Sequence, residues 1–313
     1  MASGFSILRG SLSGYPDIAG MPPAVSMEIT NHCNLHCPQC ASGSEMMTRP
    51  RGFMELTLFT KVLNELKPYL YYVCLNFQGE PMLHRGFFSF LAAAQEIRTI
   101  VSTNGHFLTA ENAEKLVAGD LWKLIVSLDG TDQETYSRYR VGGDFEKVIE
   151  GIRLVGEARK KAASEMKVEI QFLVNRYNEH QITGARKLAE KAGVKLSLKS
   201  MQILNNKNDE NWLPSTEKFR RYSVDGSTYK VKSSLPDRCS RMYLNPVVTW
   251  DGKVVPCCFD KDGEYVMGDL TSDTFMNIWN GDKYAEFRKR VLTDRKSISI
   301  CRNCTSGLRK VKC

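Results

Sequence analysis

Three cysteines near the start of the chain are the residues best suited to chemistry. Cys33, Cys37 and Cys40 offer three thiolates within eight residues, and no fourth cysteine lies nearby in the sequence. A structural zinc site uses four protein ligands, whereas a catalytic metal site leaves one coordination position open. A cubane iron–sulfur cluster held by three thiolates likewise leaves one iron free to bind a small molecule. The CxxxCxxC spacing therefore predicts a reactive cluster.

Spacing alone leaves two other interpretations of this loop open. The three cysteines could belong to a zinc site completed by His32 or His36, or they could be free thiols. The hydrophobic run at residues 24–29 directly precedes the loop and is typical of a strand. We therefore expect the loop to lie at one edge of a sheet.

The ten cysteines of the chain fall into two groups. Cys74 is the only one between Cys40 and Cys239, and this distribution does not resemble a disulfide scaffold. The second group contains Cys239, Cys257, Cys258, Cys301, Cys304 and Cys313. Two separate groups predict two metal centres.

Length and composition indicate a globular protein. At 313 residues the chain is long enough for one large domain and a smaller one. It is 42% hydrophobic and 25% charged, which is an ordinary balance. No apolar stretch reaches the roughly 18 residues that span a bilayer. Residues 1–20 lack the basic start and the apolar core of a secretory signal, so we expect a cytoplasmic protein with no membrane partner.

The charge pattern disfavours nucleic acid as a partner. The net charge of +8 is modest, and Lys and Arg are scattered along the chain. Short basic clusters at residues 159–161 and 309–312 are explained by a solvated helix face and a tail. A nucleic-acid-binding protein would carry a basic stripe interleaved with aromatic residues, and no such stripe occurs in this sequence.

Strand-like and helix-like patterns alternate from residue 24 to residue 198. Strands are expected at residues 24–29, 71–77, 99–102, 122–128, 167–174 and 194–198. Helices are expected at residues 55–66, 87–97, 110–118, 144–162 and 179–192. This alternation indicates βα units around a parallel sheet. Six strands are fewer than the eight of a complete barrel, so we predict an α/β fold with a partial, TIM-like (β/α)6 barrel.

The rest of the chain has a different character. Residues 201–235 are mostly polar and are typical of a connecting segment. Residues 244–250 and 253–255 predict a β-hairpin around an Asp-Gly turn, and residues 274–291 predict a helix. We therefore expect four parts, which are an N-terminal arm at 1–23, the barrel at 24–200, a connecting segment at 201–235, and a small α+β domain at 236–313.

The CxxxCxxC loop after a first strand, followed by βα units, resembles the radical S-adenosylmethionine (SAM) enzymes. The resemblance implies that Cys33, Cys37 and Cys40 hold a four-iron, four-sulfur (4Fe-4S) cluster whose remaining iron binds SAM. An electron from the cluster would cleave SAM reductively to a 5′-deoxyadenosyl radical, which would abstract a hydrogen atom from the substrate. Such an enzyme needs a reductant such as flavodoxin or ferredoxin.

Residues at the ends of the expected strands match positions near SAM in this family. Gly79 and Glu80 follow the second strand, where the resemblance implies an acid that faces the SAM amino group. Gln78 stands where the family typically has a first glycine, so the turn is a variant. Four further residues, implied to lie near the ribose and carboxylate of SAM, end the third and fourth strands, namely Ser102, Asn104, Ser127 and Asp129.

Other polar residues point toward the same end of the sheet. Arg140, or alternatively Arg138, is expected to pair with the SAM carboxylate in a bidentate fork, although a solvated arginine is the other interpretation. Gln171 and Lys199 are expected to contact SAM or the substrate. Gln39 stands where many family members have an aromatic residue beside the adenine, so adenine contacts must come from elsewhere.

The second cysteine group resembles the twitch domain, which is the short form of the SPASM domain. Its four implied ligands, with 17, 43 and 2 residues between successive members, are Cys239, Cys257, Cys301 and Cys304. The resemblance implies one auxiliary 4Fe-4S cluster held entirely by protein, which makes it an electron acceptor. Gly252 in the expected hairpin favours Cys257 over Cys258, and Cys313 is not expected to be a ligand. A four-cysteine zinc site stays open as the alternative.

An auxiliary cluster beside a radical site suits net oxidation, because the substrate radical can lose a second electron as a proton leaves. We therefore predict a radical SAM oxidoreductase that dehydrogenates an alcohol or a sugar-like small molecule. One alternative is a maturase that crosslinks or epimerises a ribosomally made peptide, and a more distant one is a non-catalytic zinc protein. The catalytic proton acceptor is not identified, and Glu28, Lys199 and Arg140 are candidates by position only.

Overall fold

The computed structural model describes residues 20–44, 46–204, 212–225, 228–232 and 234–304. Within these ranges the chain forms two compact units. Unit 1 contains residues 20–30, 49–77 and 222–304, and unit 2 contains residues 31–48 and 78–221. The CxxxCxxC loop therefore belongs to unit 2, whereas the described cysteines of the second group belong to unit 1.

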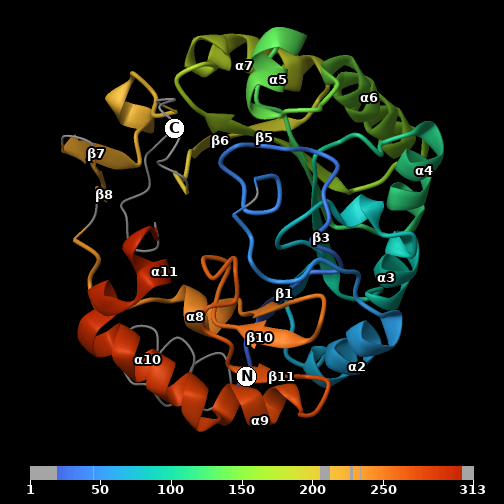
Figure 1. Ribbon diagram of the computed structural model, residues 1–313. Helices are drawn as coiled ribbons and strands as arrows, with labels where there is room; N and C mark the ends of the chain where they lie inside the picture. The colour runs from blue at the N-terminus through green and yellow to red at the C-terminus, as the bar shows by residue number, and fades with distance from the viewer. Residues whose placement is uncertain (1–19, 45, 205–211, 226–227, 233, 305–313) are drawn as a thin grey trace. The chain divides into compact units, whose positions relative to one another are not determined.

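Unit 2 is built on four parallel strands. In their order of pairing these are β3 (Arg98–Thr103), β4 (Lys123–Ser127), β5 (Lys167–Val174) and β6 (Lys195–Ser200). The helices of this unit are α3 (Phe87–Ala93), α4 (Ala110–Ala118), α5 (Gln133–Tyr139), α6 (Phe145–Lys161) and α7 (Ile182–Lys191). Figure 1 shows α3, α4, α6 and α7 on the outer side of these strands. The inner face of the sheet is therefore the face without helices.

The alternation of side chains along β5 explains which face the helices cover. Phe172 and Val174 pack with Ala185 of α7 in one buried cluster. Glu169 and Gln171 alternate with these residues along the strand and therefore point to the opposite face. The helix-free face of the β3–β6 sheet thus carries polar side chains, while its helix-covered face is apolar.

Unit 1 contains the first two parallel strands and a C-terminal hairpin. β1 (Ala24–Met27) pairs in parallel with β2 (Tyr72–Cys74), and α2 (Leu56–Leu66) lies between them in the sequence. On the other side of β1 the order is β9 (Val247–Val248), β10 (Lys253–Val255) and β11 (Gly268–Asp269). Gly252 has a φ of +85°, which the turn between β9 and β10 requires.

The remaining elements of the described residues are one antiparallel strand pair, four helices and four single turns of 3-10 helix. In unit 1 they are the antiparallel pair β7 (Tyr222–Asp225) and β8 (Thr228–Val231), and the helices α8 (Arg241–Leu244), α9 (Phe275–Asn280), α10 (Asp282–Asp294) and α11 (Ser299–Arg302). Single turns of 3-10 helix are η1 (Pro81–Leu83), η2 (Glu179–Gln181), η3 (Glu217–Phe219) and η4 (Arg295–Ser297). None of the described helices is long and apolar enough to cross a membrane.

The predicted fold class is confirmed, because all six expected parallel strands form with helices between them. Some boundaries were wrong. The helix expected at residues 274–291 is two helices that meet at Gly281, whose extended backbone ends α9 and begins α10. Residues 241–244 are helical, so the first strand of the predicted hairpin is only β9. The expected connecting segment contains β7 and β8, and α5 was not expected at all.

Candidate functional site

The three cysteines of the CxxxCxxC loop lie close together in unit 2, and all three are free thiols. The amide of Cys40 donates to the carbonyl of Cys37 at 3.2 Å, so the loop turns back on itself. Cys37 is buried, whereas Cys33 and Cys40 are partly exposed. Burial raises the pKa of Cys37 to about 12, and the charges of Cys40 and Cys33 raise it further. Such mutual effects indicate three sulfurs that can share one metal group, whose charge would displace the thiol protons.

Gly79 holds the turn that follows against this loop. It has a φ of +77°, and a Cβ there would come within 2.6 Å of the His32 carbonyl oxygen. Its amide donates to the Ser42 hydroxyl at 2.9 Å, and the Glu80 amide donates to the His32 carbonyl at 2.8 Å. Only glycine fits this position, because any side chain would collide with the backbone of the loop.

Glu80 has a structural role that its expected contact with SAM did not include. One carboxylate oxygen accepts from the Met82 amide at 3.0 Å and the Thr103 hydroxyl at 2.8 Å. The other oxygen accepts from the Asn104 amide at 2.6 Å. Burial raises the pKa of Glu80 to about 7, although these hydrogen bonds act in the opposite direction. Glu80 therefore ties the start of η1 to the end of β3.

Asn104 links the end of β3 to the cysteine loop. Its side-chain amide donates to Asn34 Oδ1 at 2.8 Å and lies 4.0 Å from Cys33 Sγ. Ser102 is half-buried two residues earlier on β3. The structure thus brings the expected residue Asn104 to the loop, and it adds Asn34, which the sequence analysis missed.

Asp129 and Arg140 form a buried ion pair beside Cys37. Arg140 Nε donates to Asp129 Oδ2 at 2.6 Å, and the Leu173 amide donates to Asp129 Oδ1 at 2.6 Å. Arg140 Nη1 lies 3.8 Å from Cys37 Sγ. Burial raises the pKa of Asp129, and the Arg140 charge opposes that rise. The pair fixes a cation next to a cysteine, while Ser127 is buried at the end of β4.

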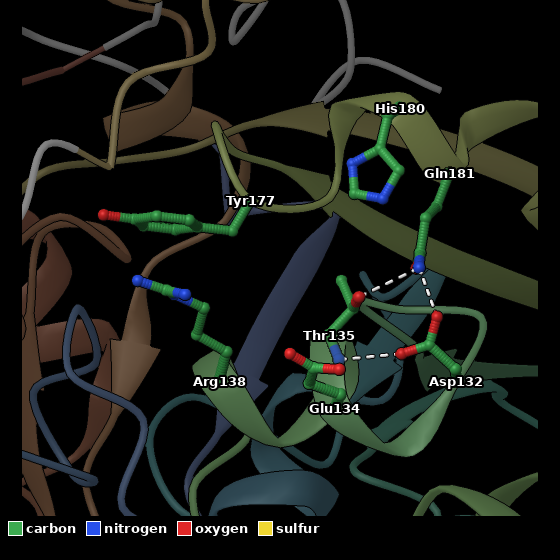
Figure 2. A pocket seen from close by; sticks show the side chains of 7 residues that line it. All are labelled: Asp132, Glu134, Thr135, Arg138, Tyr177, His180 and Gln181. Carbon is green, nitrogen blue, oxygen red and sulfur yellow. Dashed lines mark hydrogen bonds between the residues drawn. The ribbon is translucent and has the colours of Figure 1, made fainter.

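Arg138, the alternative to Arg140, packs elsewhere. Its guanidinium lies 3.7 Å from the centroid of the Tyr177 ring. Figure 2 shows both side chains at a pocket between α5 and η2 with a cavity volume of about 330 Å³. On its far side Gln181 donates to Thr135 Oγ1 at 2.9 Å and also to Asp132. Of the two arginines, Arg140 is the one in contact with the cysteine loop.

Three other residues singled out in the sequence differ in their burial and their surroundings. Gln39 is buried, and its side-chain oxygen accepts from the Leu204 amide at 2.8 Å, so it fixes a chain segment and does not stack on a ring. Gln171 lies on the helix-free face of β5, and Lys199 is exposed on β6. Near them Lys123 Nζ lies 2.7 Å from the Glu169 carboxylate, an ion pair that the sequence analysis missed.

Glu28, a candidate proton acceptor, is occupied by an ion pair in unit 1. Its two carboxylate oxygens accept from Arg49 Nη1 at 2.6 Å and Arg49 Nη2 at 2.5 Å. Its side chain is fully buried, and that of Arg49 is 11% exposed. Glu28 therefore links the chain after β1 to Arg49. The sequence did not predict this ion pair.

The second cysteine group is assembled in unit 1 from three separate parts of the chain. The four expected ligands are all buried, with exposed fractions of 3–8%, and are Cys239, Cys257, Cys301 and Cys304. Burial raises the pKa of Cys301 to about 11, and the charges of Cys304 and Cys239 raise it further. Burial also raises the pKa of Cys257, with added effects from its neighbours. The four thiols therefore lie near one another.

Two arginines accompany this group. Arg241 Nη1 donates to Cys258 Sγ at 3.3 Å, and the Arg241 charge interacts with four cysteines of the group. Arg295 is fully buried and donates to the Arg238 carbonyl at 2.9 Å, and its charge lowers the pKa of Cys301. Both arginines favour thiolates over thiols, which suits metal ligands. Cys258 is partly exposed beside Arg241, and Cys313 lies outside the described residues.

The donors present at both sites suit iron–sulfur clusters. Within the described part of the chain, no three His, Cys, Asp or Glu side chains converge as ligands of one metal ion. In a 4Fe-4S cluster each cysteine binds a different iron, so its ligands surround a larger group. One site offers three thiols and the other offers four, which are the two ligand counts expected for a cluster with an open iron and for a closed one.

Two family models match the chain. The model of the radical SAM superfamily matches residues 27–189. The model of SPASM, an iron–sulfur cluster-binding domain, matches residues 239–305. The first match covers about half of the chain, and the two matches together contain all seven expected cluster cysteines.

Curated relatives include enzymes of several kinds. AdoMet-dependent heme synthase of Methanosarcina barkeri is 28% identical over 55% of this chain and 48% of its own length. Mycofactocin maturase MftC of Mycolicibacterium smegmatis is 25% identical over 90% of this chain and 75% of its own. The SAM-dependent 2-deoxy-scyllo-inosamine dehydrogenase of Niallia circulans is 24% identical over 90% and 92%. The matched part spans about half the length of the first of these.

Solved structures share the fold. BtrN in complex with AdoMet and 2-DOIA has a TM-score of 0.59 and 20% identity, over 92% of this chain and 95% of that one. The protein is thus an enzyme that uses SAM and iron–sulfur clusters. The chain belongs to the radical SAM superfamily and carries a SPASM iron–sulfur cluster-binding domain.

Proposed function

We propose that this enzyme is a SAM-dependent dehydrogenase that oxidises an alcohol on a polar, sugar-like small molecule. The observation that carries the proposal is the second cysteine group in unit 1. Its four thiols are buried and accompanied by Arg241 and Arg295, so a cluster there would have no iron left for SAM. A closed cluster suits the acceptance of one electron, which is what net oxidation requires after hydrogen abstraction.

The proposed SAM site lies at the cysteine loop of unit 2. Cys33, Cys37 and Cys40 would hold the cluster, and SAM bound to its open iron would supply the 5′-deoxyadenosyl radical. Arg140, fixed by Asp129, holds a positive charge beside Cys37 and is available to a carboxylate. Other proposed contacts with SAM are Gly79, Glu80, Ser102, Asn104 and Ser127. Glu80 also positions the Asn104 backbone, because its carboxylate accepts from the Asn104 amide.

The chain's own residues also favour electron transfer at the second site. Proposed ligands are Cys239, Cys257, Cys301 and Cys304. Arg241 and Arg295 hold two positive charges near these sulfurs. Positive charge stabilises a more negative, reduced cluster relative to an oxidised one, because the two attract. The site is therefore better suited to receive an electron than a neutral pocket would be.

The first substrate to test is an aminocyclitol. The relative from Niallia circulans is named for 2-deoxy-scyllo-inosamine, and the alignment with this chain covers 92% of that relative's length. Hydroxyl and amino groups would suit the polar, helix-free face of the β3–β6 sheet, which carries Gln171 on β5 and an ion pair between Lys123 of β4 and Glu169 of β5. We expect this compound, or one of its class, to be oxidised at a secondary alcohol.

The decisive assay uses anaerobic, reconstituted enzyme with about eight iron and eight sulfide per chain, since each 4Fe-4S cluster contributes four of each. The substrate carries deuterium on the carbinol carbon, and the products are a ketone and deuterated 5′-deoxyadenosine. Cys257→Ala should keep 5′-deoxyadenosine formation but lose the ketone, whereas Cys258→Ala, its neighbour, is the matched control and should keep both. A chain that binds zinc and does not cleave SAM would contradict the proposal.

A peptide maturase is the second candidate function. It is favoured by the likeness to mycofactocin maturase, which extends over 90% of this chain. Incubation with a precursor peptide encoded near the gene, followed by mass spectrometry, distinguishes the two functions. A modified peptide together with unreacted aminocyclitol would replace the dehydrogenase proposal by this one.

Three further expectations are kept as proposals. The electron donor is a flavodoxin or a ferredoxin, because each turnover needs one low-potential electron. The protein works in the cytoplasm, because free thiols and iron–sulfur clusters persist in a reducing compartment. The domain boundaries stay at 24–200 for the barrel and 236–313 for the C-terminal domain, with residues 1–23 as an arm and 201–235 as a connecting segment.

A further inference from the structure

His106 is a buried histidine of unit 2 to which the proposed chemistry gives no role. It lies in the turn that follows β3, two residues after Asn104, and is 7% exposed. Both of its ring nitrogens have polar partners. The Asp144 amide lies 2.8 Å from Nε2, and Asn104 Oδ1 lies 3.1 Å from Nδ1. The ring therefore connects the start of α6 to the Asn104 side chain.

The two contacts fix which ring nitrogen carries the hydrogen. A backbone amide can only donate a hydrogen bond, so His106 Nε2 must accept from the Asp144 amide and carries no hydrogen. A neutral imidazole then has its hydrogen on Nδ1, which donates to Asn104 Oδ1. Burial lowers the pKa of His106, which favours the neutral ring. The ring is therefore an acceptor toward Asp144 and a donor toward Asn104.

This tautomer determines which end of the Asn104 amide faces the cysteine loop. Asn104 Oδ1 accepts from the His106 ring and also from the His106 backbone amide, at 3.1 Å in each case. The nitrogen end therefore points the other way, where Nδ2 donates to Asn34 Oδ1 at 2.8 Å and lies 4.0 Å from Cys33 Sγ. A reversed amide would place its nitrogen against both donors of His106, and its oxygen against a sulfur that has no hydrogen once it binds metal.

A hydrogen-bond donor beside Cys33 would change how readily a cluster at this loop accepts an electron. Reduction adds one negative charge, and part of it resides on the sulfurs. Hydrogen bonds to those sulfurs stabilise the reduced form and are among the factors that set the reduction potential of an iron–sulfur cluster. A residue that orients such a donor affects the potential without contacting the cluster itself.

We propose that the Asn104 side chain donates to the Cys33 sulfur of the loop cluster, and that His106 is a positioning residue that keeps the amide in this orientation. The loop cluster is the one proposed at Cys33, Cys37 and Cys40, and the inference rests on that part of the proposed function. The donor raises the midpoint potential of the cluster. The cluster therefore gains its electron more readily from the flavodoxin or ferredoxin proposed above, with no bond made or broken.

Two matched substitutions of His106 separate positioning from packing. In His106→Asn the new amide nitrogen stands near the position of Nδ1 and can still donate to Asn104. In His106→Gln the new amide group reaches the position of Nε2, where it can accept from Asp144 but cannot donate to Asn104. We therefore expect a more negative midpoint potential of the loop cluster in His106→Gln and an unchanged one in His106→Asn. Asn104→Leu, which has a similar shape and no donor, should give the largest negative shift.

The potentials are measured by redox titration of the reconstituted enzyme, followed by electron paramagnetic resonance. The loop cluster is the one whose signal changes when SAM is added. The auxiliary cluster in the same sample is the internal control, and its potential should be unchanged in all three variants. An unchanged potential in His106→Gln, or an equal shift in His106→Asn, would overturn the role of His106.

An unchanged potential in Asn104→Leu would overturn the donor itself. If that variant does not fold, the two His106 variants decide the question. A second measurement tests the geometry without electron transfer. In nitrogen-15 NMR of the oxidised enzyme, labelled at its five histidines, the His106 ring should carry its hydrogen on Nδ1. The signal that disappears in His106→Gln belongs to this ring, and a hydrogen on Nε2 would overturn the inference.

Failure of the proposed function has a different signature. A wild-type enzyme in which no cluster signal responds to SAM would contradict the proposed ligands Cys33, Cys37 and Cys40. The NMR experiment would still report the tautomer of His106 in that enzyme. The two failures are therefore distinguishable.

Discussion

The two cysteine sites of this chain differ in how they are built and in how much solvent reaches them. The site in unit 2 takes three cysteines from one loop of eight residues, and two of the three are partly exposed. The site in unit 1 takes its cysteines from positions up to 65 residues apart, and all four are buried. A cluster that must admit SAM needs an approach, whereas one that only accepts an electron does not. Exposure therefore separates the two proposed roles as clearly as the number of thiols.

The positive charges near the two sites are also held differently. Arg140 is paired with the buried carboxylate of Asp129 before it reaches Cys37. Arg295 donates to the backbone carbonyls of Arg238 and Pro236, and Arg241 donates directly to Cys258. Asp129 offsets part of the Arg140 charge, whereas the Arg295 guanidinium donates to two backbone carbonyls, which carry no net charge. The second site thus has two arginine charges close to its sulfurs, in agreement with the proposed electron-accepting role.

The largest expected effect comes from removing one cysteine at each site. Cys37→Ala should abolish 5′-deoxyadenosine formation, because a cluster with two ligands is not retained beside SAM. Cys257→Ala should keep that reaction and lose only the oxidised product. Chromatography of both products under anaerobic conditions measures the difference. Equal loss of 5′-deoxyadenosine in the two variants would show that the sites do not have separate roles.

The anchors of the two arginines offer a second comparison. Asp129→Asn leaves the largely buried Arg140 without its counter-charge and should lower the free energy of unfolding by about 4 kcal/mol. Asp237, which is exposed, accepts only from the Arg295 backbone amide at 2.8 Å. Asp237→Asn should therefore cost about 1 kcal/mol or less. Thermal unfolding of the two variants under identical conditions tests this, and equal destabilisation would argue against a special buried pair in unit 2.

The third prediction concerns pH and the apo-protein. Burial raises the pKa of Glu80 from 4.5 to about 7, so the folded state binds this proton more tightly than the unfolded chain. The associated stability is present below about pH 4.5 and is lost as the pH rises through 7. The expected loss is on the order of 3 kcal/mol over this window.

Glu80→Gln should flatten this dependence, and Glu146→Gln, at an exposed position on α6, should leave it unchanged. The measurement is urea unfolding at pH 5, 6 and 7 in the presence of a thiol reductant. A Glu80→Gln variant with the same slope as the wild type would mean that Glu80 is ionised in the folded protein throughout this range.

Much of the architecture follows from local patterns. The period of apolar residues located the six parallel strands and most of the helices, because the face of each element that packs against the core must be apolar. The helix expected at residues 274–291 was wrong at one point, where Gly281 adopts an extended backbone between α9 and α10. The short helix α5 was missed because its seven residues are mostly polar and bury only Tyr136 and Tyr139.

The candidate site divides in a similar way. The two groups of cysteines and the Gly79 turn could be recognised from the sequence, since their residue types and spacing are local and chemically restrictive. The partners of Glu80, Arg140, Glu28 and Arg295 could not be, because each hydrogen bond joins residues 11 to 57 positions apart or joins a side chain to a backbone group. Such pairs leave no periodic signal.

Composition and spacing were enough to predict a barrel-like α/β fold and two groups of cysteines that could bind metal, because metal-ligand spacing and strand periodicity act over a few residues. The tertiary structure determines which carboxylates accept hydrogen bonds from backbone amides or pair with arginines. It also determines which thiols remain partly exposed to solvent. Those outcomes depend on burial, and burial is a property of how distant segments pack and not of any segment alone.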